Sequence, residues 1–109
     1  MIVAERVLRL RTAGEDLPVP VRIDTPEPDR TAWTCRFTIG WPEETVSGYA
    51  TALDAVQALQ FAMERIAMLL YMSPHHRSGA LYFDEPGEGY GFLLPHGSRD
   101  LAIGLDKTL

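Results

Sequence analysis

Residues 51–73 contain neither glycine nor proline, and their apolar positions have helical spacing. Thr51 opens the stretch with Asp54 three residues later, an acidic variant of a capping box. Pro74 follows it and disfavours a further helical residue. Apolar side chains recur at intervals of three and four residues, which places them on one helix face. This first stripe consists of Val56, Leu59, Met63, Ile66 and Leu70. The pattern predicts one long helix that packs on a sheet through the first stripe.

The chain before this helix alternates between apolar and polar residues, as strands with one buried face do. Strands are expected over residues 2–11, 17–24, 31–40 and 45–50. In the third strand, four side chains face one way, and these are Trp33, Cys35, Phe37 and Ile39. This alternation predicts an antiparallel sheet with one face buried under the helix and the other solvated.

Two of these strands depart from simple alternation. In residues 2–11, Val3 and Val7 fall out of step with the leucines that follow them, which indicates a β-bulge or burial of both faces near the start. In residues 17–24, Pro18 and Pro20 cannot donate ladder hydrogen bonds, which predicts a strand at a sheet edge.

Behind the helix, residues 80–84 and 90–94 are short apolar runs joined by EPGEG, whose glycines favour a hairpin turn. The end of the chain, residues 96–109, alternates weakly and is either a loose strand or an ordered tail. The chain is therefore expected to be one α+β domain over residues 1–109, an antiparallel β-meander packed on one long α-helix in the order β-β-β-β-α-β-β.

Composition narrows the function classes. The net charge of −5 disfavours nucleic acid as a partner, because a phosphate backbone favours a basic patch. Charged residues within the predicted helix, among them Asp54, Glu64 and Arg65, argue against a membrane span. Cys35 is the one cysteine, which excludes an internal disulfide and fits a reducing compartment. We therefore expect a cytoplasmic protein that binds neither nucleic acid nor membrane.

The candidate chemistry is sparse. His75 and His76 are adjacent, with His96 further on, but a zinc site needs three or four convergent ligands, so no metal is expected. These histidines are better placed to interact with carbonyls at the helix C-terminus. The glycine-rich run over residues 85–91 precedes no helix and carries two carboxylates, so it is not a phosphate loop. We expect neither a cofactor nor a catalytic residue.

A second stripe on the predicted helix is harder to assign to an ordinary solvated face. It consists of Phe61, Arg65, Met68 and Met72, and it lies well away from the first stripe on a helical wheel. Exposed methionine and phenylalanine in a row are typical of an interaction surface. Either the tail at residues 101–105 folds over it, or another chain does. We expect another chain, in the simplest case a second copy of this one.

The segments Ala32–Phe37 and Leu53–Leu59 carry a W-x-C-x-aromatic strand followed by a D-x-x-Q-A-L helix start. This combination resembles a family of small bacterial proteins of unknown function, over roughly residues 5–95. The chain departs from that family at Ala52, where Gly is usual, and at Ala55, where Ser is usual. The resemblance implies the fold order and a bacterial origin, and it implies no activity.

Two function classes follow from these observations. The first is a non-enzymatic protein-interaction module that binds a protein partner through the second stripe. The rival is a small-molecule binding domain or modest enzyme that uses the sheet face around Trp33 or a cleft near His75, His76 and Tyr90. Convergent polar residues in a real pocket would favour the rival, whereas a flat apolar patch favours the interaction module.

Overall fold

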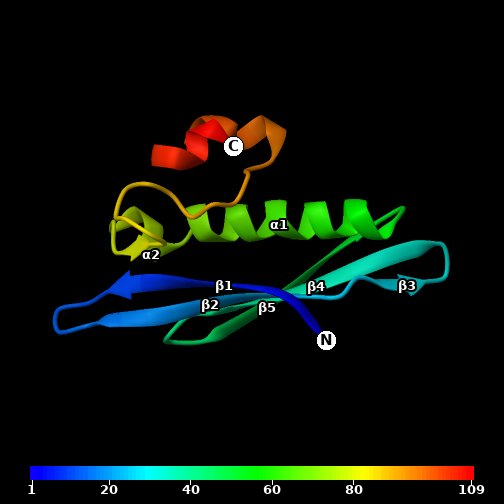
Figure 1. The fold of residues 1–109 in the computed structure, drawn as a ribbon, viewed down its shortest axis with the longest axis horizontal. Coiled ribbons are helices and arrows are strands. Elements are labelled where there is room, and N and C mark those ends of the chain that lie inside the picture. The colour runs from blue at the N-terminus through cyan, green and yellow to red at the C-terminus, as the bar shows by residue number, and fades with distance from the viewer.

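The computed structural model describes residues 1–109 and shows a twisted sheet, a long helix and a C-terminal tail in three layers (Figure 1). The strands are β1 (Ile2–Arg11), β2 (Asp16–Asp24), β3 (Glu27–Asp29), β4 (Ala32–Gly40), β5 (Thr45–Ala52) and β6 (Leu81–Tyr82). The helices are α1 (Ala55–Tyr71) and α2 (Pro74–Arg77), and the tail forms the 3-10 helices η1 (His96–Leu101) and η2 (Gly104–Thr108). The predicted α+β class, an antiparallel sheet under one long helix, is confirmed.

The main strands form the predicted meander. β1 pairs with β2, β2 with β4, and β4 with β5, each antiparallel. The short strand β3 pairs with β4 beyond the end of β2, and β6 lies on the outer side of β1. The expected bulge near the start is present as a shift in register between Ile2 and Ala4. Leu8 is fully buried, whereas Val7 on the opposite face is exposed.

β2 is an inner strand, so the prediction that it lies at the sheet edge is wrong. It pairs with β1 along its whole length and with β4 through residues 21–23. Pro18 and Pro20 precede the stretch that pairs with β4, so their missing N–H groups cost no ladder bond on that side. The real edges are β5 on one side and, on the other, the short strands β3 and β6 together with the part of β1 that lies beyond its pairing with β6.

The predicted C-terminal hairpin is also wrong. β6 is only two residues long and pairs with β1, and residues 90–94 form no strand. Gly89 and Gly91 both have positive φ, which turns the chain away from an extended path. In addition, the N–H groups of Tyr90 and Gly91 donate to the side chain of Asp106 at 2.8 Å, rather than to a neighbouring strand.

Helix α1 is shorter than predicted, because its expected first turn belongs to β5. Thr51 and Ala52 pair with β4, and the N-cap is Asp54, whose side chain accepts a 2.7 Å hydrogen bond from the N–H of Gln57. The Gln57 side chain accepts in return from the N–H of Leu53, one residue before the N-cap, at 3.2 Å, so the arrangement is a variant of the capping box. The helix ends at the C-cap Met72, immediately before the N-cap Ser73 of α2.

The buried face of α1 differs in part from the first stripe. Ile66 and Leu70 are fully buried as predicted, and Leu59 is half-buried against the core. Val56, however, is 76% exposed and Met63 is 37% exposed. The helix instead lies on the sheet through small side chains, with Ala58, Ala62 and Ala67 all at 0% exposure. Alanine side chains permit a closer approach of the helix to the sheet than valine or methionine would. With the alanines facing the sheet, Val56 and Met63 lie on the flank of the helix.

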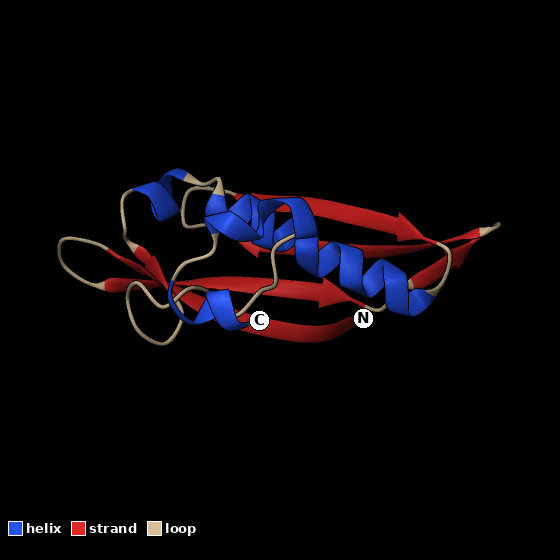
Figure 2. Ribbon diagram, turned by 90° about the horizontal axis from the view of Figure 1, so that it is seen from above, coloured by secondary structure: helices blue, strands red, loops and turns tan.

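The core lies between α1 and the inner face of the sheet. The β4 side chains predicted to face inward do so, with Cys35, Phe37 and Ile39 buried and Trp33 half-buried. Seen from above, α1 runs across the sheet and leaves strands uncovered on both sides (Figure 2). This narrow coverage leaves a groove along each flank of the helix.

Replacing Ile66 with alanine tests the buried face of α1. The substitution leaves a cavity against the sheet, so we expect Ile66→Ala to lower the free energy of unfolding by about 2–5 kcal/mol. The matched control is Val56→Ala on the same helix, which should stay within about 0.5 kcal/mol of the unmodified chain because Val56 is exposed. Urea unfolding followed by circular dichroism measures both. Equal losses in the two variants would contradict this placement of the helix.

Candidate functional site

The groove between α1 and β5 gathers most of the residues predicted to bind a partner. From the helix it is lined by Phe61, Glu64, Arg65 and Met68. Tyr49 to Thr51 line it from β5, and Pro95 is also part of the lining. Its volume is about 490 Å³. We call this the β5 groove. Met72, the fourth predicted residue, does not line it and lies 64% exposed beyond its end.

Arg65 has a role inside the chain that the sequence did not indicate. Its guanidinium donates a 2.9 Å hydrogen bond to the carbonyl oxygen of Tyr49. This bond joins the middle of α1 to the edge strand and fixes one wall of the β5 groove. Arg65 therefore positions this wall through a contact within the chain.

The other border of the β5 groove is an open strand edge. All eight residues of β5 pair with β4, and no strand pairs with β5 on its other side. Its sequence, TVSGYATA, contains no proline and no charged residue. Natural sheets usually block such an edge with lysine, proline or a bulge, because unpaired N–H and C=O groups pair readily with another chain. The sequence pattern predicted this strand but did not indicate that it lies at an edge.

The tail leaves most of the second stripe uncovered. It packs Ala102 and Ile103 against the core, and the N–H of Ile103 donates to the Tyr71 hydroxyl at 3.2 Å. Phe61 remains 40% exposed. Of the two explanations for the second stripe, coverage by residues 101–105 therefore does not account for Phe61 or Met72.

Asp106 holds the tail in place, and sequence reasoning missed it. Its carboxylate is 5% exposed and accepts from the Tyr71 hydroxyl at 2.6 Å and from two backbone N–H groups, those of Tyr90 and Gly91. The tail over residues 96–109 is accordingly ordered, with 3-10 helices in place of the weak strand that its alternation indicated. No spacing in the sequence signals a contact between residues this far apart along the chain.

The region near His75, His76 and Tyr90 is packed rather than open. Tyr90 is 1% exposed, its hydroxyl is hydrogen-bonded to His76 Nδ1, and its ring lies 5.2 Å from the ring of Tyr71. Burial raises the pKa of both tyrosines, Tyr71 further through its hydrogen bond to Asp106 and Tyr90 through the charge of that carboxylate. Burial lowers the pKa of His76. These shifts favour the neutral forms.

His75 points away from this cluster. Its Nε2 lies 2.8 Å from a carboxylate oxygen of Glu43, and its ring packs at 4.8 Å on Trp41. The hydrogen bond from His75 lowers the pKa of Glu43. The two adjacent histidines are thus divided between two different contacts, and no group of three or more His, Cys, Asp or Glu residues is placed to hold a metal ion.

Comparison with known proteins gives one match. Residues 4–94 match a family described as a domain of unknown function, DUF6968. No curated protein and no solved structure matches the chain. The match covers nearly the same range as the resemblance described from the sequence. It does not show that the W-x-C-x-aromatic and D-x-x-Q-A-L motifs are features of the family, so that part of the resemblance stays a prediction. None of the helices is both long and apolar enough to cross a membrane.

Removing the hydroxyl of Tyr71 tests the anchor of the tail. Tyr71→Phe leaves one hydrogen bond to Asp106 and one from Ile103 unmade in a buried site, so unfolding should become easier by about 1–3 kcal/mol. Tyr49→Phe is the matched control, because Tyr49 is exposed, and its change should stay within about 0.5 kcal/mol. Chemical unfolding measures both, and a Tyr71→Phe value as small as that of the control would contradict the anchor.

The lowered pKa of His76 predicts a pH dependence of stability. In the unfolded chain His76 binds a proton with a pKa of about 6.5, whereas burial lowers its pKa in the folded chain. Below that pH the unfolded state therefore holds more protons, and stability falls as pH falls. Melting temperatures measured on both sides of this pH should drop more for the unmodified chain than for His76→Gln. Equal drops would show that His76 contributes nothing to the pH dependence.

Proposed function

The chain belongs to the DUF6968 family, and we propose that it is a non-enzymatic protein-interaction module that self-associates through the β5 groove. The observation that carries this proposal is the open edge of β5 beside exposed apolar side chains of α1. An open edge supplies backbone hydrogen bonds, and the adjacent apolar residues supply buried area. Both contributions favour a protein partner.

A second copy of the chain fits this surface by symmetry. Two β5 strands that meet antiparallel across a two-fold axis would extend the sheet from one protomer into the other, and such an interface uses the same patch on both sides. The same axis would bring the two α1 grooves together, so that Phe61 of each protomer packs against the other.

A non-enzymatic role is supported by the way the reactive groups are used. The Asp106 carboxylate is buried and accepts three hydrogen bonds from within the chain. Cys35 is fully buried, its thiol donates to the carbonyl of Asp24 at 3.4 Å, and burial raises its pKa. Both groups are occupied in stabilising the fold. A free buried thiol also suits a reducing compartment, and we propose the cytoplasm.

Light scattering with size-exclusion chromatography tests the self-association. We expect the unmodified chain to be a dimer at about 50 μM, well above a dissociation constant of about 1 μM. Phe61→Glu places a charge in the apolar centre of the interface and should weaken the dimer by about 30-fold or more, as expected of a hot-spot residue. Circular dichroism should show the variant still folded, because Phe61 is not part of the core.

Two further variants make this test specific. Val56→Glu adds the same charge to an exposed position of α1 outside the β5 groove and should leave the dimer intact. Thr51→Lys places a lysine on the open edge, which natural sheets use to prevent pairing, and should weaken the dimer without touching the helix. A monomeric unmodified chain at the same concentration would rule out self-association. Dissociation by Phe61→Glu but not by Thr51→Lys would rule out pairing of the strands.

A further inference from the structure

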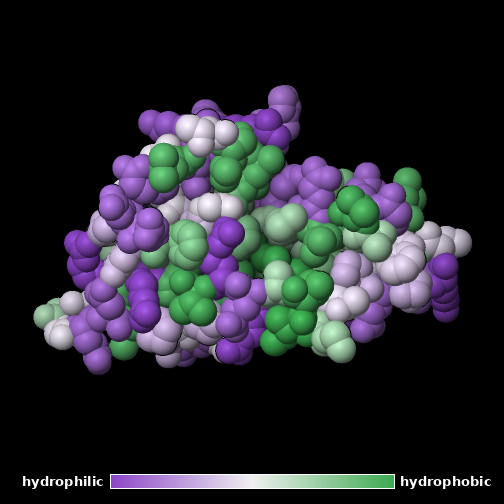
Figure 3. Space-filling view, in the orientation of Figure 1, coloured by the Kyte–Doolittle hydropathy of each residue, from purple (hydrophilic) through white to green (hydrophobic).

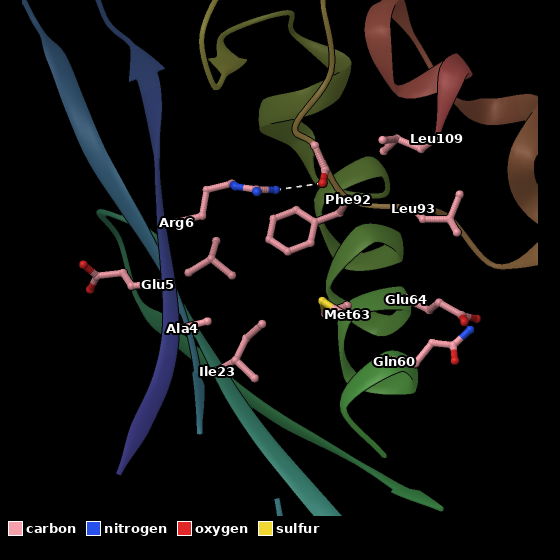
Figure 4. A pocket seen from close by; sticks show the side chains of 12 residues that line it. Ala4, Glu5, Arg6, Ile23, Gln60, Met63, Glu64, Phe92, Leu93 and Leu109 are labelled. Carbon is pink, nitrogen blue, oxygen red and sulfur yellow. Dashed lines mark hydrogen bonds between the residues drawn. The ribbon is translucent and has the colours of Figure 1, made fainter. Parts of the chain in front are cut away.

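A second groove lies on the opposite flank of α1, facing β1, and we call it the β1 cleft. It has a volume of about 440 Å³, within the range of small-molecule sites. Its floor is apolar, formed by Val21 and Ile23 of β2, and Met63 and Phe92 form its walls. Apolar side chains gather around a hollow between the sheet and α1 on the face seen in Figure 3. Figure 4 shows Arg6, Ile23, Met63 and Phe92 pointing toward one another across the cleft.

One wall of the β1 cleft is held in place by interactions within the chain. The guanidinium of Arg6 lies 4.9 Å from the ring centre of Phe83 and 4.8 Å from that of Phe92. It also donates to the carbonyl oxygen of Gly91 at 2.7 Å and, more weakly, to that of Tyr90 at 3.3 Å. These contacts fix Phe92 beside the cleft without a ligand. A preformed wall lowers the ordering cost of binding.

The polar groups that line the β1 cleft are divided between those already engaged and those that are free. Glu5 forms an ion pair with Arg22 at 2.5 Å, and Arg6 is engaged as described. Gln60 and Glu64 make no side-chain hydrogen bond and no ion pair within the chain. They project from the side of α1 that faces away from β1, at the outer rim of the lining (Figure 4). The one lining charge without a partner is therefore negative and lies at the rim, above an apolar interior.

We propose that the β1 cleft binds a small amphipathic amine, with its apolar body inside the cleft and its protonated amino group at the rim beside Glu64. The apolar floor favours an apolar body in the ligand, and the unpaired carboxylate favours a positive charge on its polar group. The engaged guanidinium of Arg6 disfavours a cation deeper in the cleft, which keeps the amino group at the rim. Met63 is unbranched and adapts its shape to the bound body. This site lies on the other flank of α1 from the β5 groove and does not depend on self-association.

Three probes of equal chain length separate the body from the charge: decylamine, decanol and decanoate, each below its aggregation concentration. Titration into the labelled protein, followed by backbone amide NMR, should shift the amides of Ala4, Ile23, Met63 and Phe92 with decylamine. Decanol should bind more weakly at the same amides, and decanoate most weakly. Shifts confined to the β5 groove, or tighter binding of decanoate than of decylamine, would overturn the proposal.

Variants of α1 test the same site from the protein side. Met63→Trp fills the β1 cleft and should abolish the shifts, whereas Val56→Trp adds the same side chain to an exposed position outside the cleft and should leave them unchanged. Glu64→Gln removes the rim charge and should weaken decylamine binding about two- to fivefold, with little change for decanol. Unchanged decylamine binding by a folded Met63→Trp protein would overturn the proposal. Light scattering of the same samples reports self-association separately, because Glu64 also borders the β5 groove.

Discussion

The close contact between the small side chains of α1 and the sheet decides the shape of both surfaces discussed above. Ala58, Ala62 and Ala67 let the helix axis approach the strands, and Ile66 and Leu70 fill the core beneath. A helix held this closely covers only the middle of the sheet. The outer strands and the flanks of α1 therefore remain as two grooves of comparable volume. The chemical character of each groove then follows from the strand at its outer border.

The two grooves differ because the two edges of the sheet differ. β5 offers an open and uncharged edge beside Phe61 and Met68, which suits backbone pairing with a flat partner. Beside β1, the segment carrying Phe92 closes one end of the groove, and the Arg6 guanidinium holds it there. That groove is consequently a concave cleft with an apolar floor. One helix thus separates the groove proposed to bind a protein partner from a cavity of small-molecule size.

The existence of the four main strands and of the long helix was predictable because each depends on local pattern. Alternation in β4 and the uninterrupted run of α1 both determine which side chains can share a face. The side of the helix that faces the sheet was harder to predict. Because valine and methionine are more apolar than alanine, the sequence pattern placed Val56 and Met63 on the buried face. The packing itself favours the side chain that allows the closest approach, and periodicity carries no information on that distance.

The contacts around Asp106 could not be predicted from the sequence for a different reason. Its partners, Tyr71, Tyr90 and Gly91, come from the end of α1 and from an irregular loop, and their meeting depends on the path of the whole tail. Residues 90–94 have the composition of a strand, yet the N–H groups of Tyr90 and Gly91 donate to a carboxylate instead. The predicted second stripe was informative about position, because three of its four residues border one groove, but the open edge beside it required knowledge of the strand order.

The position of the Asp106 carboxylate bears on where the C-terminal boundary of the domain is drawn. The family match ends at Leu94, and Asp106 lies outside it, within the tail. A chain reduced to the matched residues would leave two backbone N–H groups and the Tyr71 hydroxyl without their acceptor. The range that matches the family is therefore shorter than the range of residues needed to give these buried donors an acceptor, and the two boundaries are set by different criteria.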